Sequence, residues 1–230
     1  MKPSFDKLRT RQLNEKAGSE ALVRHALRAT FCAMSSLAPK QKLSYAEYAK
    51  RENASEGKHE FFDGEIYAMS GGTREHGFMI DRARDAIKAT LAERDCAMVG
   101  SEIRIRTPSG KGAYPDGYVV CGTIAWDSED RDSVTNPTLI LEVLSDSTEG
   151  YDREGKFKHY RSLPSLMEYV LVSYREPLIE THVRNADGSW STTFAGPGET
   201  LTLRSIGAQI PVDAVYQGMT SEDRRMTLII

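Results

Sequence analysis

Cysteine is scarce in this sequence, and its arrangement matches no zinc site. Cys32, Cys96 and Cys121 are widely spaced, without a CxxC pair or a histidine cluster at zinc-finger spacing. We therefore expect no structural zinc and, by default, a reducing compartment. No apolar run approaches the roughly 18 residues that a membrane helix needs, and no segment has the layout of a signal peptide. These absences predict a cytoplasmic protein that does not enter a membrane.

An excess of positive charge is also absent. Lys and Arg number 30 and Asp and Glu 33, which gives a formal net charge of −3. A nucleic-acid partner would have to meet a local positive patch, because the overall charge would repel a phosphate backbone. The composition is otherwise that of an ordinary globular domain. It neither supports nor excludes a nucleic-acid partner.

Length and local composition predict one folded domain between two tails. Residues 1–40 are rich in arginine and poor in large apolar side chains, so we expect a tail that is disordered or partly helical, with one helix around Glu20 to Thr30. An amphipathic targeting arm is the rival interpretation. Met34 is a candidate natural start of translation. Residues 41–215 are expected to form the domain, and residues 216–230 a C-terminal tail.

Capping and turn signals predict three elements in the first half of the domain. In "LSYAEYAKRE", Ser44 is a candidate N-cap for a short helix. In "HEFFDGEIYAMSGG", Asp63-Gly64 suits the tight turn of a hairpin. Thr73 is the candidate N-cap of a longer amphipathic helix, whose apolar stripe consists of Ile80, Ala83, Ile87 and Leu91.

The second half of the domain reads mainly as strands. They are expected in "AMVGSEIRIRTPSG", "YPDGYVVCG" and "PTLILEVLS", then in four segments between residues 165 and 205, with Asp187-Gly188 as a hairpin turn. An acidic loop separates the second and third strands, and "SDSTEGYDREGKFKHYRSL" predicts a helix. The order of elements predicts a mixed α/β or α+β domain whose central sheet is packed by two helices.

Two carboxylates stand in or beside apolar strands, namely Asp116 and Glu142. An ionised carboxylate that leaves water costs several kcal/mol or more unless a partner compensates it. If neighbouring strands bring the two acids together, a cation between them would keep both ionised. Hard oxygen ligands select Mg²⁺ or Mn²⁺, and the expected chemistry is metal-assisted hydrolysis of a phosphodiester. The alternatives are a turn role for Asp116 and an ordinary ion pair for Glu142.

The segments "HEFFDGEIYAMSGGTREH", "YPDGYVVCG" and "NPTLILEVLSDSTEGYDREGKFKHYRSLPSLMEYVLV" resemble the Uma2-type endonucleases of the PD-(D/E)XK superfamily, over roughly residues 43 to 185. The resemblance implies a restriction-endonuclease-like core, in which helices flank a mixed central sheet with an N-terminal hairpin and C-terminal strands. Asp116 matches the first acid of the superfamily signature and Glu142 the second. A Mg²⁺ or Mn²⁺ ion would be held by these acids and the backbone carbonyl of Val143.

The lysine of the superfamily signature is missing from its usual place. Leu144 stands two positions after Glu142, where the lysine is expected. In Uma2-type sequences a lysine on the following helix takes over, in the pattern D-x-x-x-K-x-x-x-Y, which here gives Asp152, Lys156 and Tyr160. Residues four apart lie on one helical face, so the three would form a single stripe. Lys158 is the fallback candidate for the catalytic lysine.

Further residues carry weaker hypotheses. Glu60, in the hairpin, is a candidate metal or water ligand, with a surface position as the alternative. His76, early in the long helix, is a candidate supporting residue, with an ordinary helix-start histidine as the alternative. Two basic segments could follow a phosphate backbone or form solvated faces: Arg104 and Arg106 in one, and Arg153, Lys158 and Arg161 in the other.

These observations favour a Mg²⁺-dependent endonuclease that hydrolyses nucleic acid, with DNA favoured over RNA. A catalytically silent binding protein with the same fold is one alternative. A metal-dependent hydrolase of small phosphoesters is another, since nothing in the chain specifies DNA. A homodimer is expected only by analogy with nucleases that cut both strands.

Overall fold

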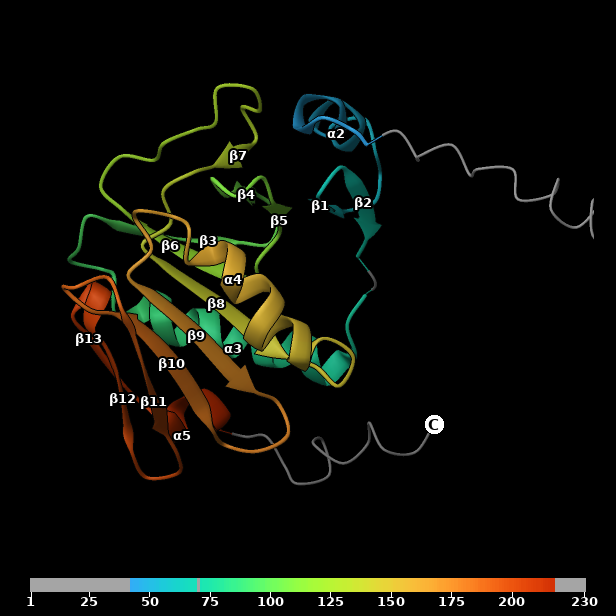
Figure 1. Cartoon of the computed structure of the whole chain (residues 1–230). Coiled ribbons are helices and arrows are strands. Elements are labelled where there is room, and N and C mark those ends of the chain that lie inside the picture. Colours follow the sequence, from blue (N-terminus) through green and yellow to red (C-terminus); the bar gives the residue numbers. More distant parts are fainter. Residues whose placement is uncertain (1–41, 70, 218–230) are drawn as a thin grey trace, which may run out of the picture. The chain divides into compact units, whose positions relative to one another are not determined.

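The structure is a computed structural model that describes residues 42–69 and 71–217 (Figure 1). The helix expected around Glu20 to Thr30 and the candidate start at Met34 lie outside the described residues. Within the described ranges, no helix is long and apolar enough to cross a membrane.

The predicted short helix and hairpin are confirmed. Helix α2 spans Tyr45–Glu52. The Ser44 side chain accepts a hydrogen bond from the Glu47 N–H, and the Glu47 side chain accepts one from the Ser44 N–H, which completes a capping box. Strands β1 (His59–Phe62) and β2 (Glu65–Ala68) pair antiparallel. Their turn holds Asp63 at φ 49° and Gly64 at φ 81°, a left-handed pair that glycine and aspartate tolerate.

The main sheet has six strands in the order β11-β10-β9-β8-β6-β3. Strand β8 is central and buried along its whole length, as its apolar sequence predicts. It runs parallel to β9 and antiparallel to β6, so the sheet is mixed. The strands are β3 (Cys96–Gly100), β6 (Gly117–Cys121), β8 (Leu139–Leu144), β9 (Glu168–Ser173), β10 (Ile179–Arg184) and β11 (Trp190–Ala195).

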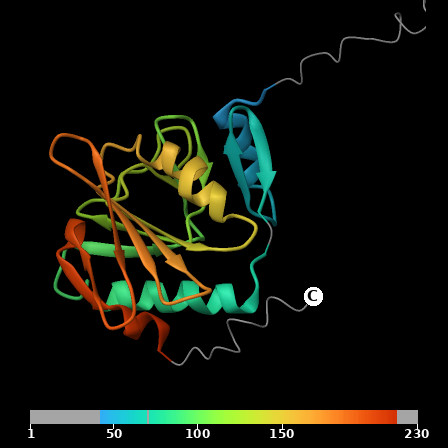
Figure 2. The ribbon, with the colours of Figure 1, turned by 60° about the horizontal axis from the view of Figure 1, so that its bottom comes forward.

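Helices cover both faces of this sheet (Figure 2). Alternate residues of β8 point to opposite faces, as in any strand. Leu139, Leu141 and Val143 pack in the core beneath α3 (Arg74–Ala89), whereas Ile140 and Leu144 pack beneath the helical segment of residues 149–160. Glu142 therefore points toward that second helical segment.

The predicted start of α3 is confirmed, because the Thr73 side chain accepts a hydrogen bond from the His76 N–H. The predicted apolar stripe needs one correction. Ile80 is only partly buried, and Met79, one position earlier, is fully buried in the core. The buried apolar face of α3 thus begins with Met79 in place of the predicted Ile80.

A second sheet of five strands has the order β2-β1-β5-β4-β7, with β4 (Arg104–Arg106), β5 (Gly112–Ala113) and β7 (Ser133–Val134). Two predictions are corrected here. The segment expected as one strand forms β3 and β4, which belong to different sheets, because the chain turns after Gly100. The acidic loop contains β7, which pairs parallel to β4.

The C-terminal part of the described chain adds a two-stranded sheet and a helix. Strand β12 (Thr200–Leu203) pairs with β13 (Ala208–Pro211) across the 3-10 helix η2 (Arg204–Ile206). Gly207 ends η2 at φ 60°. Helix α5 (Val212–Tyr216) was not predicted from the sequence; it buries Val212 and Val215 in the core to which α3 also contributes.

The structure pairs Cys96 with Cys121 in a disulfide between β3 and β6. The two residues lie directly opposite each other in the strand register. The default expectation of a reducing compartment did not include this bond, since a separation of 25 residues has no sequence signature before the strand register is known.

Candidate active site

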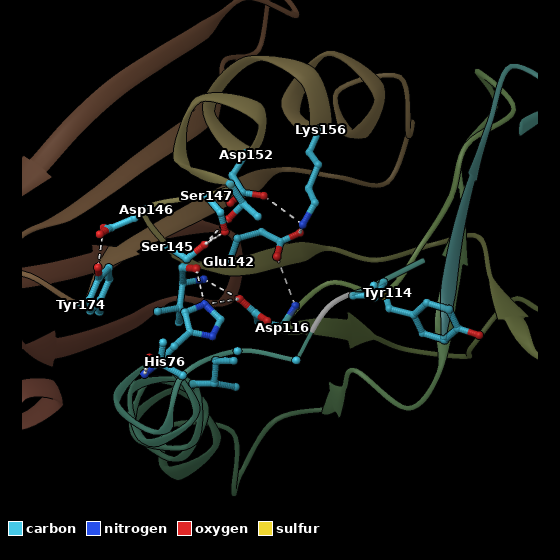
Figure 3. Close-up of a pocket in the computed structure, with 17 residues that line it drawn as sticks. His76, Tyr114, Asp116, Glu142, Ser145, Asp146, Ser147, Asp152, Lys156 and Tyr174 are labelled. Atoms are coloured by element: carbon cyan, nitrogen blue, oxygen red, sulfur yellow. Dashed lines mark hydrogen bonds and ion pairs between the residues drawn. The ribbon is translucent and has the colours of Figure 1, made fainter. Parts of the chain in front are cut away.

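Asp116 and Glu142 meet where β6 begins beside the middle of β8 (Figure 3). Gly117, the first residue of β6, pairs with Leu141 in an antiparallel register. One position further along, Asp116 and Glu142 therefore lie opposite each other. The Val143 N–H donates a hydrogen bond to Asp116 Oδ2 at 2.7 Å. The Asp116 N–H donates one to Glu142 Oε2 at 3.3 Å. Each acid is thus fixed by the backbone of the other's strand.

Lys156 reaches Glu142 from the following helix. Its Nζ lies 3.1 Å from Glu142 Oε1 and 2.9 Å from Asp152 Oδ1. The Tyr160 hydroxyl donates a hydrogen bond of 2.8 Å to the same Glu142 oxygen. The structure therefore brings the predicted stripe of Asp152, Lys156 and Tyr160 against the second acid. Leu144, which occupies the usual lysine position, is buried in the core beneath this helix.

The predicted helix contains a π-helical turn, η1 (Tyr151–Lys156), followed by α4 (Phe157–Tyr160). Such turns are frequent at functional sites. The carbonyl of Asp152 accepts a hydrogen bond from the Tyr169 hydroxyl at 2.9 Å, which ties the turn to β9. A Cβ at position 155 would lie only 2.4 Å from the Tyr151 ring, so glycine is required for this packing. The turn fixes Asp152 and Lys156 in direct contact.

His76 approaches the same acids from the first turn of α3. Its Nε2 donates a hydrogen bond of 2.8 Å to the carbonyl of Val143 and lies 3.9 Å from Asp116 Oδ2. Nε2 must therefore carry a proton, because a carbonyl can only accept. The predicted supporting histidine lies at the site, and the Val143 carbonyl already has one partner.

A cavity of about 300 Å³ opens over these groups (Figure 3). Its wall comes mainly from three regions: the start of α3 with the residues before it, Tyr114 and Asp116 just before β6, and β8 with the helical segment that follows. It therefore lies at the end of β8, where three elements meet. Its polar lining residues include Thr73, His76, Asp116, Glu142, Ser145, Asp146, Ser147, Thr148, Asp152 and Lys156.

Two further charged residues extend the site. Lys111 Nζ lies 2.7 Å from Glu60 Oε2, and Glu60 Oε1 lies 3.9 Å from Lys156 Nζ. Lys111 was not predicted as a site residue, because a lysine between glycines in "SGKGAY" is typical of an exposed turn. We refer to six groups as the charged cluster: Glu60, Lys111, Asp116, Glu142, Asp152 and Lys156.

Burial dominates the electrostatics of the charged cluster. It raises the pKa of Glu142 to about 8, although Lys156 works in the opposite direction. Burial likewise raises the pKa of Asp116, against the hydrogen bond from the Val143 N–H. Burial favours the neutral form of Lys156, but Glu142 and the other carboxylates outweigh it and hold its pKa well above the ordinary value. Without an added cation, the site therefore disfavours two ionised acids.

The donors of the charged cluster fit a divalent cation in kind and in charge. Fully ionised, it holds four carboxylates and two ammonium groups, an excess of two negative charges. Asp116, Glu142 and the Val143 carbonyl offer the hard oxygens that Mg²⁺ and Mn²⁺ prefer. In the described part of the chain, no three His, Cys, Asp or Glu side chains surround a common point that could hold a metal. The candidate ligand set thus needs the backbone carbonyl and water.

The predicted phosphate-binding role of Arg104 is wrong. Its guanidinium is buried and forms a double hydrogen bond with the fully buried Asp130, at 2.6 and 2.7 Å. It also donates to the hydroxyl of Tyr114 and the side chain of Asn53. The alternation of Arg104 with isoleucines suggested a solvated face, but the acidic loop covers that face.

The other predicted basic residues fall into two groups. Arg106 is paired with Asp127 and Glu129, and Arg153 is paired with Glu149 and Glu180. Lys158 and Arg161 are exposed on the helical segment and the turn after it. Lys158 does not contact the charged cluster in any described interaction, so geometry favours Lys156 as the lysine of the site.

Comparison with known proteins agrees with this architecture. The family model "Uma2: Putative restriction endonuclease" matches residues 45–213. "Uncharacterized protein slr1290" from Synechocystis sp. is 39% identical over 186 residues, which cover 79% of this chain and 95% of that protein. "Uncharacterized protein sll1609" from the same organism is 31% identical over 152 residues, which cover 66% and 86% respectively.

A solved structure shares the fold. It is described as a "putative nuclease belonging to DUF820" from Anabaena variabilis, and it matches with a TM-score of 0.59 at 13% identity, covering 70% of this chain and 91% of that one. The mixed sheet flanked by helices is accordingly a restriction-endonuclease-like fold. With the family model spanning most of the described domain, the chain belongs to the Uma2 family.

Proposed function

We propose that this protein is a divalent-metal-dependent endonuclease that hydrolyses phosphodiester bonds of nucleic acid, with DNA as the favoured substrate. The observation that carries the proposal is the contact of Lys156 with Glu142, which itself is linked to Asp116 through the backbone. Two acids and one lysine are the chemical groups of the PD-(D/E)XK signature. The family description supports nucleic acid as the substrate class.

A Mg²⁺ or Mn²⁺ ion would be held by Asp116, Glu142 and the carbonyl of Val143. When bound, such an ion polarises a phosphoryl oxygen and lowers the pKa of a coordinated water. The excess negative charge of the fully ionised charged cluster favours binding of a cation here. Glu60 is less suited as a ligand, because Lys111 already neutralises one of its oxygens.

Lys156 would act on the attacking water and on the phosphate. An ammonium group has three donors; Glu142 accepts one of them, and Asp152 is held as an ion pair. A remaining donor can bind a water or a phosphate oxygen in the cavity, where it can orient the nucleophile and offset charge in the transition state. Asp152 and Tyr160 keep the lysine and Glu142 in this arrangement. His76 fixes the backbone of Val143 from the opposite side.

A cleavage assay across substrate classes tests the proposal. Purified protein is incubated with Mg²⁺ or Mn²⁺ and with supercoiled DNA, linear duplex, single-stranded DNA, RNA or a small chromogenic phosphodiester. Cleavage of a nucleic acid that requires the metal supports the endonuclease. Hydrolysis of the small ester alone supports the phosphoesterase alternative. Binding of nucleic acid without cleavage under either metal supports the silent alternative and contradicts the proposal.

A further inference from the structure

Lys111 is a buried lysine with no part in the reaction outlined above. Its side chain is 0% exposed, and its Nζ donates hydrogen bonds to Glu60 Oε2 at 2.7 Å and to the Tyr151 hydroxyl at 2.8 Å. Its backbone is fixed by three hydrogen bonds with Thr107. A buried lysine is rare and costly unless it is paired. Here the cost is met by one carboxylate.

Glu60 lies between two lysines that come from different elements. One of its oxygens is paired with Lys111, and the other has no hydrogen-bond partner and lies 3.9 Å from Lys156 Nζ. That distance is longer than a hydrogen bond, so Glu60 attracts Lys156 without holding it. Lys156 instead donates a hydrogen bond to Glu142 at 3.1 Å and forms an ion pair with Asp152 at 2.9 Å. The pairing of Glu60 with Lys111 thus decides how strongly the Glu60 carboxylate competes with Glu142 for the ammonium group of Lys156.

We propose that Lys111 is a positioning residue for Lys156, acting through Glu60. By neutralising Glu60, it leaves the ammonium group of Lys156 on Glu142, where the reaction needs it. Without Lys111, Glu60 is a buried carboxylate whose nearest cation is Lys156, and it draws that ammonium group away from Glu142. This role rests on the proposed nuclease function for its catalytic consequence, but not for its effect on the charged cluster.

The second hydrogen bond of Lys111 supports the same role. Tyr151 is the first residue of the π-helical turn that carries Asp152 and Lys156. Lys111 therefore connects β1, through Glu60, to the start of the helix that supplies the catalytic lysine. These elements are far apart in sequence, and one buried ammonium group fixes their separation at the site.

The test compares Lys111→Met, Glu60→Gln and the double variant with the wild type. Lys42→Met is the matched control. Like Lys111, Lys42 pairs with an acid of the β1–β2 hairpin, here Asp63, but both members of this pair are exposed. We expect Lys111→Met to lower kcat by about 10- to 100-fold, as loss of a supporting group does, with little change in KM. Adding Glu60→Gln should restore most of kcat, since the competing charge is gone. Lys42→Met should change neither value.

Binding of Mn²⁺, measured by electron paramagnetic resonance, separates this role from a structural one. Lys111→Met removes a positive charge near the acids, so we expect Mn²⁺ to bind several-fold more tightly even as kcat falls. Weaker binding together with a lower kcat would indicate a distorted site and would overturn the proposal. This readout needs no cleavage, so it still decides the role of Lys111 if the wild type cleaves nothing and the proposed function fails.

If Lys111→Met does not fold, the double variant and Glu60→Gln still decide. Once Glu60 is neutral, Lys111 can no longer affect Lys156 through the charge of the Glu60 carboxylate. Adding Lys111→Met to Glu60→Gln should then change kcat by less than about twofold. A further tenfold loss in the folded double variant would show that Lys111 acts by another route and would refute the proposal.

Discussion

The ammonium group of Lys156 lies 3.1 Å from Glu142 Oε1, although one residue belongs to a helix and the other to the central strand of the sheet. Leu144, on the same face of that strand, fills the place where related nucleases carry their lysine, and it packs into the core. The lysine that is missing from the strand is replaced by Lys156 of the helix that packs on this face.

Glu142→Gln should weaken Mn²⁺ binding by at least about tenfold, because it replaces a charged ligand with a neutral one of the same shape. Asp146→Asn is the control: Asp146 lines the same cavity, but it is paired with Tyr174 and Arg175. Titration of free Mn²⁺ by electron paramagnetic resonance measures both. Equal affinities of Glu142→Gln and the wild type would exclude Glu142 as a ligand.

Lys156→Met and Lys158→Met should differ sharply. Lys156 is buried against carboxylates, whereas Lys158 is exposed two positions later on the same helical segment. We expect the first variant to lose cleavage by about 100-fold or more, through the loss of a positioned charge in the site. The second should retain it. The cleavage rate of each variant at saturating metal is the measurement. Loss of cleavage in Lys158→Met alone would show that Lys158, the fallback candidate, is the catalytic lysine.

Arg104→Met should destabilise the fold without affecting nucleic-acid contacts. The substitution leaves the buried Asp130 carboxylate without its positively charged partner, and breaking a buried pair in this way lowers the free energy of unfolding by about 3 to 5 kcal/mol. Arg161→Met, at an exposed position, should change stability by less than about 0.5 kcal/mol. Urea unfolding measures both. If Arg104→Met keeps wild-type stability but reduces the salt dependence of DNA binding, the arginine contacts phosphate after all.

Stability of the metal-free protein should depend on pH through Glu142. Its pKa is about 8 in the folded protein, against an ordinary value of 4.5. Between these values the folded state holds a proton that the unfolded state releases, so the free energy of unfolding falls as pH rises from about 5 to 8. Urea unfolding in the presence of a chelator measures this slope. Glu142→Gln should flatten it; an unchanged slope would show that other groups cause it.

Local sequence signals predicted the elements that frame the site. Ser44 and Thr73 were identified as N-caps, and the Asp63-Gly64 turn as a hairpin, because each signal lies within a few residues of the element it sets. Burial of Glu142 followed from its apolar neighbours. Its contact with the Asp152, Lys156 and Tyr160 stripe came from the family pattern, and it could not be derived from helical spacing alone.

Contacts between distant segments explain what the sequence could not predict. Arg104 meets Asp130 only because the acidic loop folds back as β7, and Lys111 meets Glu60 only because β5 pairs with β1. The disulfide likewise depends on the register of β3 and β6. In each case the residue looked exposed or unpaired in its own segment, and its partner was 25 or more residues away.

Single-turnover cleavage of DNA at saturating Mn²⁺ tests the central claim most directly, with the wild type, Asp116→Asn, Glu142→Gln and Asp146→Asn compared side by side. We predict metal-dependent cleavage by the wild type and Asp146→Asn, and a loss of about 100-fold or more in each of the other two. Cleavage at the wild-type rate by Asp116→Asn and Glu142→Gln would contradict the account, because the two acids would then not form the centre of the reaction.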